Sequence, residues 1–166
     1  MDKVKERKWA SALWNGDFYL IETWTGYRSS GRDPKGKQHM LEPGASLDAL
    51  GTALLDALSY SRFLSLEELD EFFDYENRAR TYENWVQALI ERHGYKSRRA
   101  LFKNMACCSI EVMVEKSEMS ITPNRHEKLE AWGREKDDGI EDVIISANSS
   151  AAAVGEALRL AFSRCK

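Results

Sequence analysis

The sequence predicts an α+β fold, in a single domain over residues 1–166, with a mostly antiparallel central sheet of about five strands packed by about four helices. Two patterns predict this fold. Apolar residues recur at helical spacing in several segments, and segments with alternating or β-branched residues lie on both sides of them. The composition agrees, because 43% apolar and 31% charged residues are typical of a globular chain and argue against disorder.

Two strands are predicted before the helices. Residues 17–24 are rich in aromatic and β-branched side chains, which favour an extended backbone. A Gly-, Ser- and Pro-containing loop follows over 26–36, and its composition is typical of a connection between strands. We therefore expect a short strand over 37–41 to pair back on the first.

Three further strands are predicted after the main block of helices. Apolar and more polar residues alternate over 108–114, as on a half-buried strand, and residues 119–122 are the expected hairpin partner. Residues 142–146 are more uniformly apolar, which favours a strand covered on both faces. This last strand is therefore predicted to be central in the sheet.

The first two predicted helices have clear start signals. Ser46 can cap a helix whose apolar positions recur at helical spacing from Leu47 to Leu58. Ser65 and Glu68 have the spacing of a capping box, in which each side chain bonds the backbone N–H of the other. The second helix is accordingly predicted to begin at Ser65.

The other two helices are predicted in the same way. Thr81 is the expected N-cap of a helix that Gly94 ends, because glycine readily adopts the left-handed conformation at a helix C-terminus. Ser149 or Ser150 opens the last helix, whose apolar stripe runs through Val154, Leu158 and Phe162.

The three cysteines predict neither a disulfide framework nor a metal site. Cys107 and Cys108 are adjacent and Cys165 is the penultimate residue, so their number and spacing favour buried free thiols. No CxxC or paired His–Cys pattern follows them. We expect no metal and no cofactor.

The predicted location is cytoplasmic, with no membrane partner. The N-terminal segment MDKVKERKWASALW carries basic residues but lacks the apolar region of a secretory signal. No stretch approaches the roughly 20 apolar residues that span a bilayer.

Catalysis is an alternative that the histidines raise. Only His39, His93 and His126 are present, and the sequence lacks the HExxH, phosphate-loop, dinucleotide-binding and nucleophile-elbow motifs. A small hydrolase that uses His126, Glu127 and Cys108 is one alternative function. The pattern favours a protein that is not an enzyme.

Nucleic-acid binding is a second alternative, which depends on the basic segment over residues 92–103. Tyr95 and Phe102 alternate there with basic residues, a mixture that can stack on bases and hold phosphates. The basic residues are Arg92, Lys96, Arg98, Arg99 and Lys103. The net charge of −3 argues against an RNA-associated regulator, so we expect no direct nucleic-acid partner and a basic segment that is solvated or paired with acids.

A set of segments in the later part of the chain resembles a known family. They are FLSLEE (63–68), DYE (74–76), RRALFKNM (98–105), CSIEV (108–112), ITP (121–123), HEKLEAW (126–132) and ALRLAFSRCK (157–166). Together and in this order they resemble the immunity proteins of bacterial contact-dependent growth inhibition systems, over about residues 60–166.

This resemblance implies a partner rather than a reaction. Such immunity proteins are cytoplasmic and bind the C-terminal toxin domain of a large secreted effector that neighbouring cells deliver. Many of these toxins are nucleases. The chain is then expected to be one immunity-protein-like domain that neutralises its cognate toxin, with no binding residue fixed by a family motif.

The acidic segment LSLEELDEFFDYE, residues 64–76, is the predicted contact surface. A nuclease cleft that holds a polyanion is basic, so an acidic helix can compete for it and speed association. On a helix from Ser65, we expect Leu66, Leu69, Phe72 and Phe73 to face inward. The predicted toxin-binding residues are Glu67, Glu68, Asp70, Glu71, Asp74 and Glu76. The last two argue for a function, because the helix dipole disfavours anions late in a helix.

Overall fold

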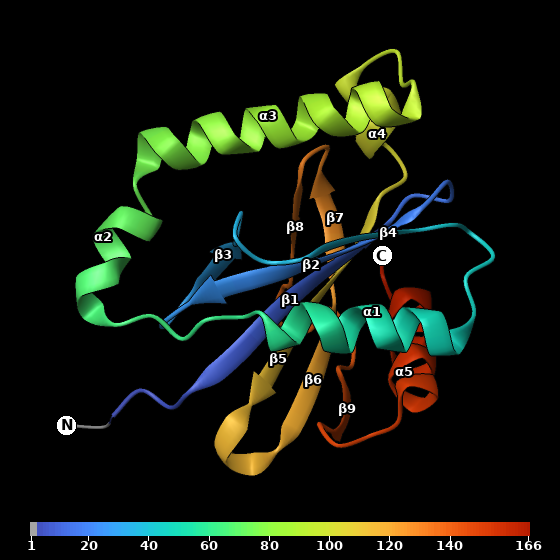
Figure 1. Cartoon of the computed structure of the whole chain (residues 1–166). Helices are drawn as coiled ribbons and strands as arrows, with labels where there is room; N and C mark the ends of the chain where they lie inside the picture. Colours follow the sequence, from blue (N-terminus) through green and yellow to red (C-terminus); the bar gives the residue numbers. More distant parts are fainter. Residues whose placement is uncertain (1–2) are drawn as a thin grey trace.

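An antiparallel sheet forms the centre of the computed structural model, which describes residues 3–166 (Figure 1). Seven strands of this part of the chain form the sheet in the order β3-β2-β1-β5-β6-β9, and β4 pairs with the same edge of β2 as β3. The strands are β1 (Arg7–Trp14), β2 (Tyr19–Gly26), β3 (Ser30–Arg32), β4 (Gln38–Leu41), β5 (Ala106–Met113), β6 (Glu118–Pro123) and β9 (Val143–Ser146). A second sheet pairs β7 (Arg125–Lys128) with β8 (Ala131–Gly133).

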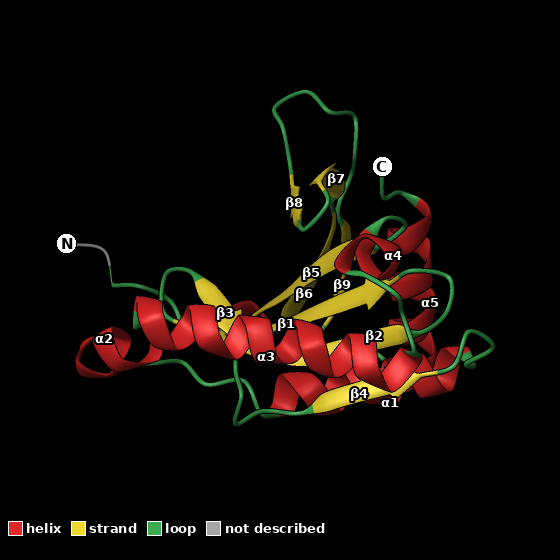
Figure 2. Cartoon of the chain, turned by 90° about the horizontal axis from the view of Figure 1, so that it is seen from above, coloured by secondary structure: helices red, strands yellow, loops and turns green. Residues whose placement is uncertain are grey.

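The helices divide between the two faces of the main sheet. Figure 1 shows α3 crossing on one side, away from α1 and α5. In Figure 2, β7, β8 and a long loop beside them project from the body of the molecule. The helices are α1 (Leu47–Ser59), α2 (Leu69–Phe72), α3 (Tyr75–His93), α4 (Arg98–Phe102) and α5 (Ala151–Ser163), with short 3-10 turns η1 (Leu66–Glu68) and η2 (Val114–Lys116).

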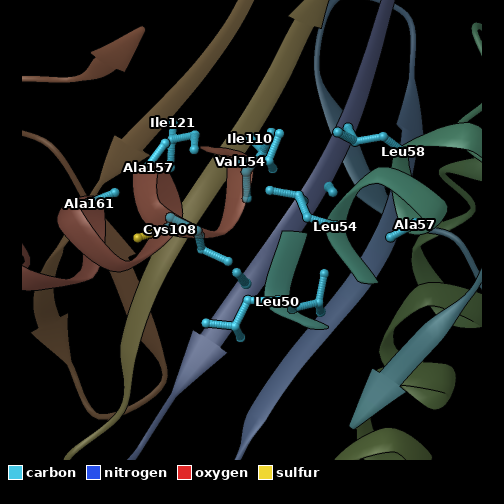
Figure 3. Packing of buried hydrophobic residues seen from close by; sticks show 14 of the residues in the cluster. Leu50, Leu54, Ala57, Leu58, Cys108, Ile110, Ile121, Val154, Ala157 and Ala161 are labelled. Carbon is cyan, nitrogen blue, oxygen red and sulfur yellow. The ribbon is translucent and has the colours of Figure 1, made fainter. Parts of the chain in front are cut away.

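The first face of the sheet is closed by α1 and α5. Side chains such as Leu54 and Val154 point with Ile110 and Ile121 into one fully buried cluster (Figure 3). The two helices touch through their backbones. A Cβ atom added at Gly155 would lie 1.8 Å from the Leu47 carbonyl oxygen, so only glycine permits this approach.

The second face is covered only in part. Because strand side chains alternate between faces, Leu13 and Leu20 point away from the first cluster. They pack with Val86 and Leu89 of α3 and with Phe102 of α4 in a second buried cluster. Beyond this cluster the same face of the sheet remains open beside the N-terminal half of α3.

The predicted fold class is confirmed, with three differences in the main sheet, one of which is β3, a strand inside the loop predicted over 26–36. The pairing of 37–41 with the first predicted strand and the hairpin of 108–114 with 119–122 are both present. The prediction missed β1, which lies in the middle of the sheet. The central placement of 142–146 is wrong, because β9 is an edge strand that pairs only with β6 and leaves Ile144 59% exposed.

The predicted helix ends are confirmed at four places and wrong at one. Ser46 and Ser150 accept the backbone N–H of Ala49 and Ala153, and Gly94 ends α3 with a φ of 69°. The capping box of Ser65 and Glu68 is present. Thr81 is not an N-cap: it lies inside α3, where its hydroxyl donates to backbone carbonyls of the preceding turn.

Candidate functional site

A cleft of about 980 Å³ lies between the open part of the sheet and α3. Its floor is formed by residues of β1, β2 and β5 whose side chains point to the second face. Its walls come from β3, from α3 and from the turn between β7 and β8. The lining includes the aromatic residues Trp24, Tyr75, Tyr82, Trp85 and Trp132.

Glu22 carries a buried negative charge on the floor of this cleft, and its side chain is fully hydrogen-bonded. The residue is only 3% exposed. Arg32 donates from Nε to both carboxylate oxygens at 3.1 Å, and Gln38 and Trp85 donate to Oε2 at 2.9 and 3.0 Å. The Arg32 guanidinium also lies 3.6 Å from the centroid of the Trp85 ring. This network satisfies the charge that the cleft buries.

Asp33 likewise has an arginine of its own. Arg62 donates from two nitrogens to its carboxylate at 2.9 and 3.1 Å, and the Thr25 hydroxyl donates at 2.7 Å. Burial alone raises the pKa of Asp33, but the hydrogen bonds from Arg62 and Thr25 outweigh it and hold the pKa below its ordinary value. The carboxylate is therefore ionised and paired at neutral pH.

Glu130, in the turn between β7 and β8, is paired in the same way. Arg98 donates to it from Nε at 3.1 Å, and Arg98 also bonds Glu83 at 2.6 Å. The Tyr82 hydroxyl donates to Glu130 at 2.7 Å. Hydrogen bonding from Arg98 lowers the pKa of Glu130, while burial and the bond to Glu130 raise the pKa of Tyr82. The turn is thus tied across the cleft to α3 and α4.

Arg78 lines the cleft as well, but its charge is not paired in this way. Its Nη1 donates to the carbonyl oxygen of Arg32 at 2.7 Å, and its guanidinium lies 4.8 Å from the Phe72 ring centroid. Within residues 3–166 it forms no ion pair with a carboxylate. Burial and the neighbouring Arg32 charge lower its pKa, although arginine remains protonated at any ordinary pH.

The six predicted acidic residues are all exposed, but they do not lie on one helix. Glu67 and Glu68 lie in η1, Asp70 and Glu71 in the four-residue α2, and Glu76 in the first turn of α3. Asp74 is the N-cap of α3 and accepts the backbone N–H of Asn77 at 2.9 Å. Among the described residues, none of the six forms an ion pair with a basic side chain.

This arrangement corrects the dipole argument for Asp74 and Glu76. Both residues stand at the N-terminus of α3, where the helix dipole favours anions, and not at the end of the preceding helix. Capping explains the position of Asp74, and the helix dipole explains that of Glu76. Of the side chains expected to face inward, Leu66 is 68% exposed and Phe73 36% exposed, so that expectation is wrong for these two.

The acidic segment borders the cleft. Tyr75 directly follows the Asp74 cap, is 84% exposed and lines the cleft together with Arg78 one turn later. Phe72 and Phe73 lie against the Arg78 guanidinium, at 4.8 and 5.7 Å from their ring centroids. The exposed carboxylates and the cleft thus form adjoining parts of one surface.

The residues of the alternative hydrolase are not brought together. The Cys108 side chain is fully buried in the first cluster, its Sγ atom lies 3.7 Å from that of Cys165, and burial raises its pKa well above the ordinary value. The His126 ring stacks on Trp132, and its Nε2 lies 2.8 Å from the Leu129 carbonyl oxygen. Cys107 and Cys108 are buried free thiols, as predicted, and Cys165 is partly exposed.

The basic segment over 92–103 does not present its aromatic residues for stacking. Phe102 is fully buried, and the Tyr95 hydroxyl donates to Asp17 and accepts from Asn15. Burial and the bond to Asp17 raise the pKa of Tyr95 to about 12. Arg98 is paired with acids, as expected, while Arg99 and Lys103 are exposed.

No cluster of three or more His, Cys, Asp or Glu side chains could hold a metal ion within residues 3–166. No helix there has the length and apolar character that crossing a membrane requires.

Sequence reasoning missed the cleft. Its charged groups come from β2, β3, α3 and the turn after β7, which are distant in the sequence, so no local motif indicates them. The one available signal is that Arg32 and Asp33 are adjacent in the loop predicted over 26–36, in a chain with five tryptophans. That signal does not identify which acid each arginine meets.

The comparisons with known proteins place this partly open α+β domain in the class of immunity proteins. The family model described as CdiI, CDI immunity protein, matches residues 8–165, and the chain belongs to this family. The immunity protein CdiI-YPIII of Yersinia pseudotuberculosis serotype O:3 (strain YPIII) is 40% identical over 178 residues, covering 100% of this chain and 99% of the relative.

Two solved structures share the fold along nearly the whole chain. One is a CdiA-CT/CdiI toxin and immunity complex from Yersinia pseudotuberculosis, with a TM-score of 0.88, 37% identity, and 99% and 100% of the two chains covered. The other is a protein of unknown function from Neisseria meningitidis, with a TM-score of 0.90, 37% identity, and 100% and 99% covered. The resemblance found in residues 60–166 therefore extends through the N-terminal strands.

Proposed function

We propose that the protein binds the C-terminal toxin domain of a cognate CdiA effector in the cytoplasm and thereby neutralises it. The observation that carries this proposal is the full-length similarity to a chain whose solved structure is described as a toxin and immunity complex. Neutralisation by binding needs no turnover. The Cys108 thiol and the His126 ring each contact other groups, which agrees with this mode of action.

The proposed contact surface consists of the cleft and the acidic segment beside it. The cleft supplies aromatic and arginine side chains, which dominate the binding energy of many protein interfaces. The six exposed carboxylates supply a negative field that attracts a basic partner. We therefore expect a toxin whose contact surface is mainly basic, as the active cleft of a nuclease is, with the acidic residues Glu67 to Glu76 acting in encounter.

The test is to co-express and purify the protein with the toxin domain encoded next to its gene, and to measure binding by calorimetry. We expect a dissociation constant in the nanomolar range, on the order of −12 kcal/mol. A toxin domain from an unrelated system is the control and should show no binding. A cognate complex weaker than micromolar, or toxin activity that persists in the complex, would remove the proposal.

A further inference from the structure

In the cleft, each lining carboxylate has an arginine partner, but one lining arginine has no carboxylate partner among residues 3–166. The three acids that line it, Glu22, Asp33 and Glu130, are each paired with an arginine of their own. Arg78 is a further lining arginine, and no carboxylate among residues 3–166 pairs with it. Lys37 also lines the cleft, so the lining holds three acids and three bases, but Arg78 is the lining guanidinium without a carboxylate partner in this part of the chain.

The Arg78 guanidinium is held in a fixed place. Its Nη2 atom lies over the backbone of Gly31 in β3, where a Cβ atom would stand only 2.0 Å away. Its Nη1 donates to the Arg32 carbonyl oxygen, and the rings of Phe72 and Phe73 flank it. The hydrogen bond to Arg32 uses one of the five N–H donors of the Arg78 guanidinium. The other donors of this positioned, partly buried cation have no acceptor among residues 3–166.

Another N–H donor, on the floor of the cleft, has no acceptor at all in the described part of the chain. Trp24 lines the cleft, and its Nε1–H is covered from solvent without a hydrogen-bond partner in the described part of the chain. Buried donors without acceptors are rare and costly in folded proteins. Trp24 and Arg78 line the same cleft, so the indole N–H signal of Trp24 can serve as a reporter of binding there.

We propose that Arg78 is the receiving site for a carboxylate side chain, Asp or Glu, of the protein partner that docks in the cleft. This inference rests on the proposed function, because it names the chemistry by which the toxin would be recognised there. A planar guanidinium matches a carboxylate with two parallel N–H···O bonds. Arg78 would then have a carboxylate partner from the toxin, as Arg32, Arg62 and Arg98 have carboxylate partners from this chain.

A carboxylate fits this place better than a phosphate of a nucleic acid. The rings of Phe72 and Phe73 flank Arg78, the neighbouring Arg32 is already paired with Glu22, and the exposed acids of the adjoining segment would repel a polyanion. Lys37, a further cation of the lining, is exposed and lies 4.9 Å from the Tyr60 ring centroid, so it does not form a phosphate clamp with Arg78. A single partner carboxylate, in contrast, needs only one fork of donors.

The first experiment tests the site without the toxin. N-acetyl-glutamate methylamide, and its neutral glutamine analogue, are titrated into isotopically labelled protein while the Arg78 Nε–H and tryptophan indole signals are followed by NMR. We expect a saturable shift with the charged probe only, in the wild type and in R80Q, and no such shift in R78Q. Arg80 is the matched control because it is an exposed arginine of α3.

G31A provides a variant that keeps the charge but displaces it. The new methyl group would push the flexible end of Arg78 aside, so the saturable shift should weaken while circular dichroism stays normal. No shift in the wild type, or the same shift in R78Q, would overturn the site. A parallel titration uses inorganic phosphate at the same ionic strength. If phosphate binds with a lower dissociation constant than the carboxylate probe, the assignment to a protein side chain is overturned.

The second experiment uses the toxin complex. R78Q should raise the dissociation constant about tenfold or more, because it leaves a partner carboxylate desolvated and unpaired, while R80Q should change it less than about threefold. Equal affinity of wild type and R78Q would overturn this inference and leave the proposed function standing. If the wild type binds no toxin, the proposed function fails, and the probe titration alone decides whether Arg78 receives a carboxylate.

Discussion

The two faces of the sheet are covered in opposite ways. On the first face, α1 and α5 close over apolar strand residues so tightly that backbone meets backbone at Gly51 and Gly155. On the second face, α3 and α4 cover one end, and the rest is a cleft whose buried groups are charged. Alternation along β1, β2 and β5 produces both surfaces from the same strands.

The first face stabilises the fold, and the second face is the one that we propose for recognition. The first cluster is nearly all apolar, and its energy comes from burial and close packing, which any folded relative needs. The second face instead holds Glu22, Asp33 and Glu130 in ion pairs, an arrangement that contributes little net stability compared with apolar packing. Its polar network agrees with the contact surface that we propose.

The largest expected effect is on the first face. Gly155→Ala would place a methyl group 1.8 Å from the Leu47 carbonyl oxygen, and backbone atoms cannot turn away as a side chain can. We expect the free energy of unfolding to fall by about 3 kcal/mol, measured by urea denaturation. Gly44→Ala is the matched control, since nothing lies within 4 Å of the added atom.

This variant also tests the separation of the two faces. At a temperature where Gly155→Ala is still folded, it should bind the toxin as the wild type does, because the cleft is untouched. Equal loss of stability in both glycine variants would show that the helices are not in backbone contact. A folded Gly155→Ala protein with weakened binding would show that the two faces are coupled.

Lowering the pH should have a smaller effect on the free energy of unfolding, through His93 on the second face. His93 stacks on Phe18 of the second cluster at 4.1 Å between ring centroids, and its buried Nε2 has no hydrogen-bond partner among residues 3–166. Burial and the nearby Arg92 charge lower its pKa below 6.5, while Asp17 acts in the opposite direction. The folded state therefore accepts a proton less readily than the unfolded state does.

The sign of the pH dependence follows. As pH falls from about 6.5 towards the folded pKa, the unfolded state binds the proton first, so the free energy of unfolding falls by up to about 1.4 kcal/mol per pH unit. His93→Phe keeps the stacking and removes the titrating group. Urea denaturation between pH 7 and 5 should show a shallower fall for the variant, and identical pH slopes would contradict this role of His93.

Local signals in the sequence predicted most of the elements but could not predict how they are used. The caps at Ser46 and Ser150 and the hairpin of β5 with β6 depend on neighbouring residues, so they were predictable. The strand β1 was missed because Ala10, Ser11 and Ala12 lack strand propensity and are extended only by pairing on both sides. Tertiary pairing overrode propensity there.

The candidate site was less predictable than the fold. Glu22 and Trp85 are bonded across 63 positions, so the cleft exists only once the sheet and α3 are assembled. The acidic segment contains two helix start signals. The capping box at Ser65 is present in the structure, but Asp74 caps a new helix nine residues later. The acidic composition of the segment was predictable. The interruption between α2 and α3, which places these acids beside the cleft, was not.

The smallest expected effect concerns the rim, where the acidic segment should contribute to encounter rather than to stability. The variant replaces four carboxylates by their amides, which keeps the shape and the capping box: Glu67→Gln, Glu68→Gln, Asp70→Asn and Glu71→Gln. All four residues are exposed and form no ion pair within the described chain, so unfolding should change little. Stopped-flow association with the toxin should be about three- to tenfold slower, with a weaker dependence on ionic strength.

The control removes the same total charge from other exposed positions, by replacing Glu42, Asp137, Glu141 and Glu156 with their amides. Because charges more than about 10 Å apart are largely screened at moderate salt, only the variant near the contact surface should slow association at about 0.1 M ionic strength. Equal rates for both variants would mean that net charge alone steers the partner. Wild-type rates for the acidic-segment variant would leave the cleft as the sole contact surface, and Asp74 and Glu76 would then act only on the helix α3 at whose N-terminus they stand.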